Sequence, residues 1–332
     1  MIEVDTSTHV VMGIGLAGLS QCDPVVASEP ATAAAVFLGV MLGSQAPDAD
    51  TFFKWKSNIL YIQQHRGISH SPPMAVVWSV LIAALAVGIM PGASFRHVLA
   101  WTALSVFIHI VADLFNPYGT LAAWPFVNRW VCLNIIALFD PIIFSTHLAA
   151  IALWVTGLVS PRIVFPILYG VLVLYYIWRI RAHRQVVQRL PDRDPEREEG
   201  ESYTVMPTVA LSRWNIVKRR RDGTFRLGHW KRGTVTWTDT VRCSGHPLVE
   251  ASRSHPAVQA LLDTSRFVCA TMEPTRYGYA VRWADVRYRH RKQFPLVALV
   301  MMNREGDIID YFVGWLNRPG RAKRYGLEWE RS

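Results

Sequence analysis

The first half of the chain contains long runs of apolar residues, and these runs limit what it can fold into. They occur at residues 74–90, 98–112 within a segment ending at Phe115, 141–159 and 163–178. Each is near the length of a helix that crosses a bilayer, about 17 to 25 residues. Two shorter apolar stretches, at 10–19 and 31–43, are spans only if their flanks join them. We therefore predict an all-α polytopic membrane helical bundle with four to six spans.

The second half of the chain has a different composition, rich in Arg, Trp, Thr and Tyr. From about Tyr203 apolar and polar residues alternate, as in TFRLGHWKRGTVTWTDTV, and this alternation indicates strands. The stretch 255–272 has helical spacing, whereas 279–290 and 295–315 have the pattern of further strands, the last turning at residues 304–306. A small α+β domain is therefore expected after the membrane bundle.

Between these halves lies a charged, proline-containing stretch with few large apolar residues. Such a segment buries too little surface to offset the entropy of ordering, so only a short basic helix is expected at its start. We expect a helical membrane domain at residues 1–180, a charged linker at 181–201 and a soluble α+β domain at 202–332.

The net charge of +10 does not by itself indicate a nucleic-acid partner. Arg179, Arg181 and Arg184 follow the last apolar run, as is typical of a cytoplasmic anchor beside a membrane helix. The basic run at 218–221 suits anionic lipid as well as nucleic acid. We therefore expect membrane lipid as a partner, a cytoplasmic C-terminal domain and no nucleic acid.

The cysteines are scattered, without a CxxC pair, and are expected to be isolated thiols. They are Cys22, Cys132, Cys243 and Cys269.

A histidine and an aspartate lie four residues apart in the second long apolar run. His109 and Asp113 therefore project from one face of a helix, one turn apart. Ionisable groups in or beside a membrane helix are costly unless paired or ligated. Imidazole and carboxylate together favour zinc, manganese or iron, although a hydrogen bond between the two side chains would also explain their spacing.

Further ionisable groups lie near the ends of other apolar runs. Asp48 and Asp50 either end a helix or bind a cation, and one of them can ligate while the other orients a histidine. His65 and His70 complete a set of two histidines and two acids from separate segments. His9 is a fifth member or an interfacial histidine at a helix start. So many donors on one side of a membrane domain predict a metal site.

Four segments carry a family resemblance: THVVMGIGLAG, GSQAPDAD, HRGISHS and HIVADLFNPYGTLAAWPF. Together they resemble the LexA-regulated, membrane-bound, metal-dependent hydrolases of bacterial inner membranes. The likeness covers roughly residues 8–145 and implies a multi-pass protein of the bacterial inner (plasma) membrane.

The same order of residues is distantly similar to zinc-dependent phospholipase C and P1-type nucleases. That similarity implies that Asp113 bridges two metals, that His9 serves one of them, and that Asp50, His65 and His109 serve the other. The downstream His, His, Glu set of that superfamily has no counterpart in this chain, so one or two ions are expected.

The resemblance implies a metal-dependent hydrolase, phosphoesterase-like, with zinc as the expected metal and manganese or iron as alternatives. A bound metal would supply hydroxide near neutral pH. Arg66 would clamp a phosphate or anchor lipid headgroups, His70 would be a ligand or the proton donor, and Asp48 would orient a ligand. A phospholipid or other lipid phosphate suits a site at the membrane edge, and a soluble phosphoester is the other option. The alternative is a non-enzymatic metal transporter, or a scaffold with a structural metal.

Overall fold

The computed structural model describes residues 2–276, 278–288 and 294–316. These residues form two compact units. The first unit contains residues 2–50, 66–189 and 205–214, and the second contains 51–65, 190–204 and the described residues from 215 onward. The segment 51–65 therefore leaves the helical unit and returns to it within the first 66 residues of the chain.

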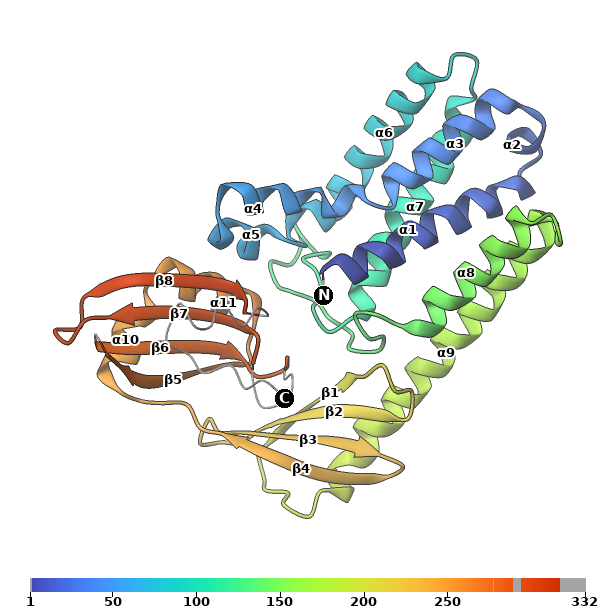
Figure 1. Cartoon of the computed structure of the whole chain (residues 1–332). Coiled ribbons are helices and arrows are strands. Elements are labelled where there is room, and N and C mark those ends of the chain that lie inside the picture. Colours follow the sequence, from blue (N-terminus) through green and yellow to red (C-terminus); the bar gives the residue numbers. More distant parts are fainter. Residues whose placement is uncertain (1, 277, 289–293, 317–332) are drawn as a thin grey trace. The chain divides into compact units, whose positions relative to one another are not determined.

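Six long helices build the first unit (Figure 1). They are α1 (Ile2–Leu19), α3 (Pro30–Gly43), α6 (Pro72–Ile89), α7 (Phe95–Phe115), α8 (Pro141–Val155) and α9 (Pro161–Arg193). Short elements connect them: η1 (Ser20–Cys22), α2 (Pro24–Ser28), η2 (Ala46–Phe52) and η3 (Ile68–His70). Proline stands in the first turn of α2, α3, α6 and α8, where its missing N–H breaks no helical hydrogen bond.

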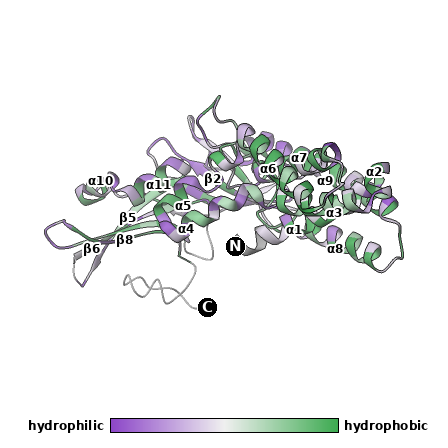
Figure 2. Ribbon diagram, turned by 90° about the horizontal axis from the view of Figure 1, so that it is seen from above, coloured by the Kyte–Doolittle hydropathy of each residue, from purple (hydrophilic) through white to green (hydrophobic). Residues whose placement is uncertain are grey.

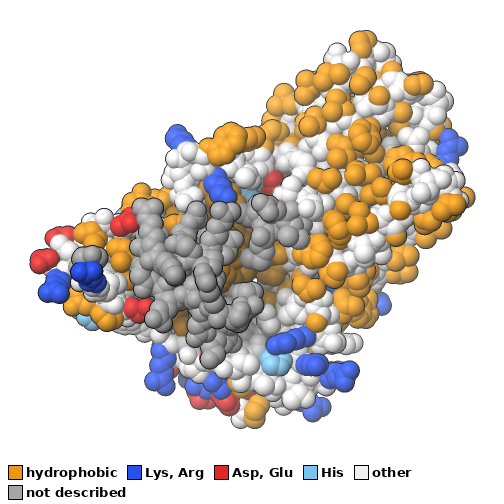
Figure 3. Space-filling view, viewed as in Figure 1, with side chains coloured by type: hydrophobic (Ala, Val, Ile, Leu, Met, Phe, Trp, Pro, Cys, Tyr) orange, Lys and Arg blue, Asp and Glu red, His pale blue; other side chains and the backbone are white. Residues whose placement is uncertain are grey.

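Three of the described helices, α6, α7 and α9, are long and apolar enough to cross a membrane. They correspond to three of the four predicted long runs. The fourth run forms α8, which has only 15 residues, and α3 is a second short apolar helix of 14 residues. Most residues of these helices are hydrophobic (Figure 2). Hydrophobic side chains also cover much of the visible surface of the helices, as expected where lipid replaces water (Figure 3).

Small residues let the helices of this unit approach closely. A Cβ atom on Gly39 of α3 would clash with Thr102 of α7, and one on Gly18 of α1 would clash with Phe165 of α9. Close approach of this kind is how helices gain packing energy where water is absent. The contact between Gly39 and Thr102 holds α3 against α7, and α3 leads directly into η2.

The second unit contains most of the β structure, in two four-stranded sheets with the orders β1-β2-β3-β4 and β5-β6-β7-β8. The first sheet comprises β1 (Ser202–Pro207), β2 (Arg213–Arg219), β3 (Phe225–Lys231) and β4 (Thr234–Val241). Arg232 and Gly233 both have positive φ, 50° and 89°, which is the backbone of a two-residue hairpin turn. The predicted strand pair at 224–241 is therefore confirmed.

The second sheet comprises β5 (Val268–Thr275), β6 (Gly278–Asp285), β7 (Leu296–Met302) and β8 (Ile308–Trp315), which pair antiparallel in sequence order. Two helices, α10 (Pro247–Arg253) and α11 (Pro256–Thr264), precede it. The expected helix at 255–272 thus ends at Thr264, and β5 follows. The overall expectation, a helical membrane bundle followed by an α+β domain, is confirmed.

Two short helices from the first third of the chain also belong to the second unit. They are α4 (Phe53–Lys56) and α5 (Asn58–Gln64), and α5 packs against α11 and β8. Tyr61 and Ile62 of α5 are buried. Residues 181–193, expected to be a charged linker that starts with a short helix, instead continue α9 to Arg193.

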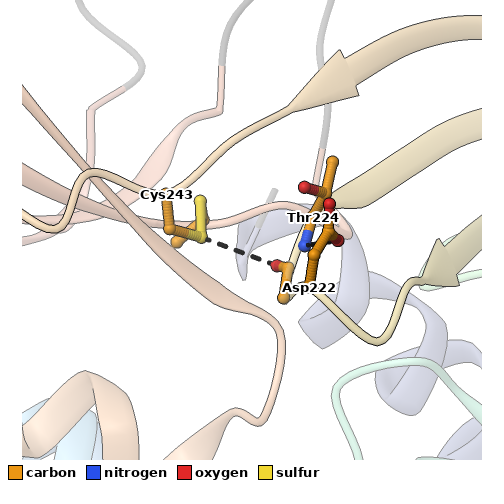
Figure 4. The surroundings of a disulfide bond; sticks show 5 residues. Asp222, Thr224 and Cys243 are labelled. Carbon is orange, nitrogen blue, oxygen red and sulfur yellow. Dashed lines mark hydrogen bonds between the residues drawn. A yellow bond between two sulfur atoms is a disulfide. The ribbon is translucent and has the colours of Figure 1, made fainter.

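A disulfide joins Cys243, which follows β4, to Cys269 in β5, with a Cα–Cα distance of 5.1 Å (Figure 4). Cys243 also contacts the carbonyl of Gly223, next to the turn in which Asp222 accepts a hydrogen bond from the Thr224 N–H. The expectation of isolated thiols is therefore wrong for these two residues, because the fold brings together positions 26 residues apart. It holds for Cys22 and Cys132.

Candidate metal centre

Four ligand-type side chains of the first unit converge at the end of α7. Asp48 comes from η2, His70 from η3, and His109 and Asp113 from α7. One potential ligand atom from each lies within 4.8 Å of those of the other three. His70, His109 and Asp113 are buried, and Asp48 is partly buried. We call these four residues the cluster.

Asp113 lies at the middle of the cluster because the predicted i, i+4 spacing places it one turn after His109. Its Oδ2 atom lies 3.2 Å from His70 Nε2 and 3.5 Å from His109 Nε2. Asp48 Oδ1 lies 3.6 Å from His70 Nε2 and 3.8 Å from His109 Nε2. The two imidazoles therefore face two carboxylates.

A hydrogen bond from His109 determines which of its ring nitrogens carries the hydrogen and which presents a lone pair to the cluster. His109 Nδ1 lies 2.7 Å from the backbone carbonyl of Ser44, which can only accept. Nδ1 therefore carries the hydrogen, and in the neutral ring Nε2 is the acceptor. A backbone carbonyl that holds the far nitrogen in this way is the usual support of a metal-binding histidine.

A longer chain of contacts orients His70 in the same sense. Ser69 donates its hydroxyl hydrogen to Asp50 Oδ2 at 2.6 Å, so its oxygen is free to accept from His70 Nδ1 at 3.0 Å. His70 Nε2 then also presents a lone pair to the cluster, 3.3 Å from His109 Nε2. Asp50 is not a member of the cluster, but its contact with Ser69 helps to fix the orientation of the His70 ring.

This donor set fits a divalent cation. Two imidazole lone pairs and two carboxylates place only hydrogen-bond acceptors at the centre, so they repel one another unless a positive charge lies between them. Mixed nitrogen and carboxylate ligands suit zinc, manganese and iron. Asp48, His70, His109 and Asp113 would hold such an ion.

Two further groups contact the other oxygen of Asp113. His9 Nε2 lies 3.3 Å from Oδ1, and the His9 ring stacks on the His109 ring with centroids 3.8 Å apart. Arg66 Nη2 lies 3.1 Å from the same oxygen. Asp113 thus joins the cluster on one side to His9 and Arg66 on the other.

The backbone holds Arg66 in an unusual conformation. Its φ of 60° is rare for a residue with a side chain. The Arg66 N–H donates to Asp50 Oδ2 at 2.8 Å, its carbonyl accepts from the Leu121 N–H at 2.9 Å, and its guanidinium lies 5.3 Å from the centre of the Tyr118 ring. These contacts position a buried cation beside Asp113.

The protonation of the ligands outside the spanning helices favours metal binding. Burial lowers the pKa of His70, although the negative charge of the nearby Asp113 carboxylate acts in the opposite direction. Burial alone would raise the pKa of Asp48, but a proton on His109, whose place a metal ion would take, and the nearby Arg66 outweigh it, so the pKa falls below its ordinary value. A neutral imidazole and an ionised carboxylate are the forms that bind a metal.

Two further polar residues, His65 and Asn116, lie outside the cluster. His65 belongs to the second unit, where its ring stacks on Tyr61 with centroids 4.8 Å apart, so its role as a ligand stays a prediction. Asn116 directly follows α7, and its Oδ1 accepts hydrogen bonds from the N–H groups of Tyr118 and Gly119. Asn116 Nδ2 also donates to Asp113 Oδ1 at 3.3 Å.

Sequence reasoning missed the supporting contacts of Ser44 and Ser69. Ser44 acts through a backbone carbonyl, which carries no signal in a sequence. Ser69 does stand in HRGISHS, beside His70, but only the fold brings Asp50 to its hydroxyl.

Comparisons with known proteins agree with the two parts of the chain. A family model described as the YdjM inner membrane protein matches residues 4–186, and one described as the YfhP C-terminal alpha/beta plait domain matches residues 247–325. Over 316 residues the chain is 39% identical to the uncharacterized protein YfhP of Bacillus subtilis (strain 168), covering 94% of this chain and 95% of that protein. No solved structure matches. The chain is therefore a membrane protein that belongs to the YdjM inner membrane protein family.

Proposed function

We propose that this protein is a metal-dependent hydrolase that cleaves a phosphoester, with a lipid phosphate as its substrate class. The observation that carries the proposal is the cluster, in which two imidazole lone pairs and two carboxylates meet beside a buried arginine. A metal held there would supply an activated water and polarise a phosphoryl oxygen.

The residues around the cluster have separable tasks in this proposal. Arg66 binds phosphate oxygens through its planar guanidinium, which suits two oxygens at once. Asp113 holds Arg66 and both histidines in one arrangement. Asp50 and Ser69 keep the His70 ring in its ligand tautomer.

A substrate with an apolar chain suits the location of the cluster along the helices. His70 lies two residues before Pro72, where α6 begins, and Asp113 lies two residues before Phe115, where α7 ends. Both helices are candidate membrane spans, so the cluster lies near the ends of spans, where lipid meets water. We place this end on the cytoplasmic side, because the arginines after the last apolar run and the loop lysines lie on it.

Metal content tests the first half of the proposal. The protein, purified in detergent and depleted of metal, is reloaded separately with zinc, manganese and iron and assayed by elemental analysis. Wild type is expected to retain one or two ions per chain. Asp113→Asn and His109→Ala are expected to lose them, and His97→Ala, which alters a histidine paired with Asp23 outside the cluster, is expected to retain them. If wild type and all three variants contained no metal after reloading, the proposed metal site would be contradicted.

Hydrolysis tests the second half. Phosphate release from a lipid phosphate in mixed micelles is compared with release from a soluble aryl phosphate, before and after metal depletion. We expect metal-dependent release that is faster with the lipid. Arg66→Lys should retain the metal but lower kcat/KM by about tenfold or more, because a lysine cannot bind two phosphate oxygens in one plane. Stoichiometric metal without any hydrolysis would favour the transporter or the scaffold.

A further inference from the structure

A further buried histidine lies outside the cluster, on α8. His147 is fully buried, and its Nδ1 atom lies 2.7 Å from the backbone carbonyl of Ile143. Because a carbonyl only accepts, Nδ1 carries the hydrogen. A charged imidazole among apolar side chains would be costly, so the neutral ring presents a lone pair at Nε2.

Among the described residues nothing donates a hydrogen bond to this lone pair. His147 Nε2 is buried without a hydrogen-bond partner. The nearby hydroxyl of Tyr169, whose ring meets the His147 ring edge-on, donates instead to the carbonyl of Met12. A buried acceptor without a donor costs about 1–3 kcal/mol, so the position of His147 calls for a donor from outside the chain.

The same histidine lines a cavity of about 340 Å³ between α1, α7, α8 and α9. The rest of the lining is almost entirely apolar, with Ile108, Val111 and Leu172 among its members. This volume is at the lower end of small-molecule sites, about 300–1,000 Å³. Since α7 and α9 are candidate spans, a lipid is the kind of molecule that the surroundings of the cavity would supply.

We propose that this cavity binds a lipid alcohol, with the apolar chain among the cavity side chains and the hydroxyl donating a hydrogen bond to His147 Nε2. A hydroxyl is the simplest donor that an otherwise apolar molecule carries. An acyl chain alone would fill the space but would leave the histidine without a partner. The proposal does not depend on the hydrolase activity, because His147 is not part of the cluster.

Binding of matched probes to the purified full-length protein in detergent tests the proposal. Two alcohols, farnesol and 1-dodecanol, are each compared with their own methyl ethers, which keep the chain and lose the donor. We expect each alcohol to bind about fivefold to tenfold more tightly than its ether, because the ether leaves the buried acceptor unpaired. Comparing the affinity for farnesol with that for 1-dodecanol shows whether the cavity prefers an isoprenoid or a straight-chain alcohol.

Variants assign the effect to the histidine and to the cavity. His147→Leu keeps an apolar side chain of similar size, so it should bind alcohol and ether equally. Val111→Phe narrows the cavity and should weaken both probes. His183→Leu removes a half-buried histidine that also contacts a backbone carbonyl, that of Val205, outside the cavity, and this variant should behave as wild type.

Three results would overturn the proposal: no binding of any probe, equal binding of alcohol and ether to wild type, or a preference for alcohol that survives in His147→Leu. Equal binding would mean that water satisfies the histidine. An unfolding midpoint of His147→Leu close to that of wild type, measured in the same detergent, shows that the variant folds. It also keeps this test distinct from a failure of the proposed hydrolase.

Discussion

At the scale of single residues, the cluster shows how hydrogen bonds behind a ligand determine its chemistry. His109 and His70 both turn a lone pair inward because their outer nitrogens are held, one by the Ser44 carbonyl and the other by Ser69. Contacts of this kind fix both the tautomer and the orientation of a metal ligand. The buried His147 follows the same rule with a different partner.

Removing the hydroxyl behind His70 tests this rule. Ser69→Ala leaves all four cluster residues in place but frees the His70 ring, so we expect metal affinity to fall by about 10- to 100-fold. Competition with a chromophoric chelator measures the change. Ser71→Ala, which alters the next serine along the chain, is the control. An unchanged affinity in Ser69→Ala would show that Ser69 does not orient His70.

The spacing of His109 and Asp113 was enough to predict that they share a helix face, because α-helical periodicity is local. The choice between Asp48 and Asp50 could not be made in that way. The two carboxylates are two residues apart, and the turn of η2 directs Asp48 into the cluster and Asp50 toward Ser69 and the Arg66 N–H. Which acid ligates therefore depends on a backbone conformation that the residue pattern does not specify.

At the scale of elements, the end of α9 is held by a buried ionic network in the second unit. Asp194, directly after α9, accepts hydrogen bonds from Lys218, Tyr203 and Trp237. Lys218 also pairs with Glu201 at 3.1 Å. The basic run at 218–221 suits lipid or nucleic acid by its composition, but its first residue, Lys218, is fully buried in this network. Strand alternation indicated the sheet, whereas only the fold shows the acid that Lys218 meets.

Acid should weaken this network. Burial alone would raise the pKa of Asp194, but hydrogen bonds from Lys218, Trp237 and Tyr203 lower it below the ordinary value. A carboxylate with a lowered pKa contributes stability above its unfolded pKa, near 3.9, and loses that contribution as the pH falls through its folded pKa. We expect Asp194→Asn to lower the free energy of unfolding by about 1–3 kcal/mol at pH 7.

Urea unfolding of the full chain in detergent, followed by tryptophan fluorescence, measures this difference at several pH values. The gap between wild type and Asp194→Asn should narrow as the pH falls below about 4. Asp263→Asn, an exposed site, should match wild type throughout. A gap that does not depend on pH would contradict an ionised Asp194.

At the scale of the whole molecule, two features bear on the orientation in the membrane. The loop that contains α4 and α5 belongs to the same unit as the plait domain, the α/β region formed by α10, α11 and β5–β8, so we expect loop and domain on the same side of the membrane. Arg162, at the start of α9, donates to the Gln21 carbonyl beside Cys22, which places Cys22 at the opposite end of the spans. Cys22 and Cys243 are therefore expected on opposite sides of the membrane, so their labelling can show the orientation of the protein.

Thiol labelling measures the orientation. In spheroplasts, a membrane-impermeant maleimide should label a variant that keeps only Cys22. A variant that keeps only Cys243, which is exposed, should react only after the membrane is opened, because the C-terminal domain is expected in the cytoplasm. Labelling of Cys243 from outside would reverse the orientation.

The path of residues 51–65 also limits how the protein can be divided. This segment begins one residue after Asp50 and ends one residue before Arg66, and its buried residues Tyr61 and Ile62 lie on a helix that packs against α11 and β8. A truncated chain that stops after α9 would therefore keep every cluster residue but expose the apolar face of α5 to solvent. The membrane half is not an independent module, because part of its chain depends on the C-terminal domain for burial.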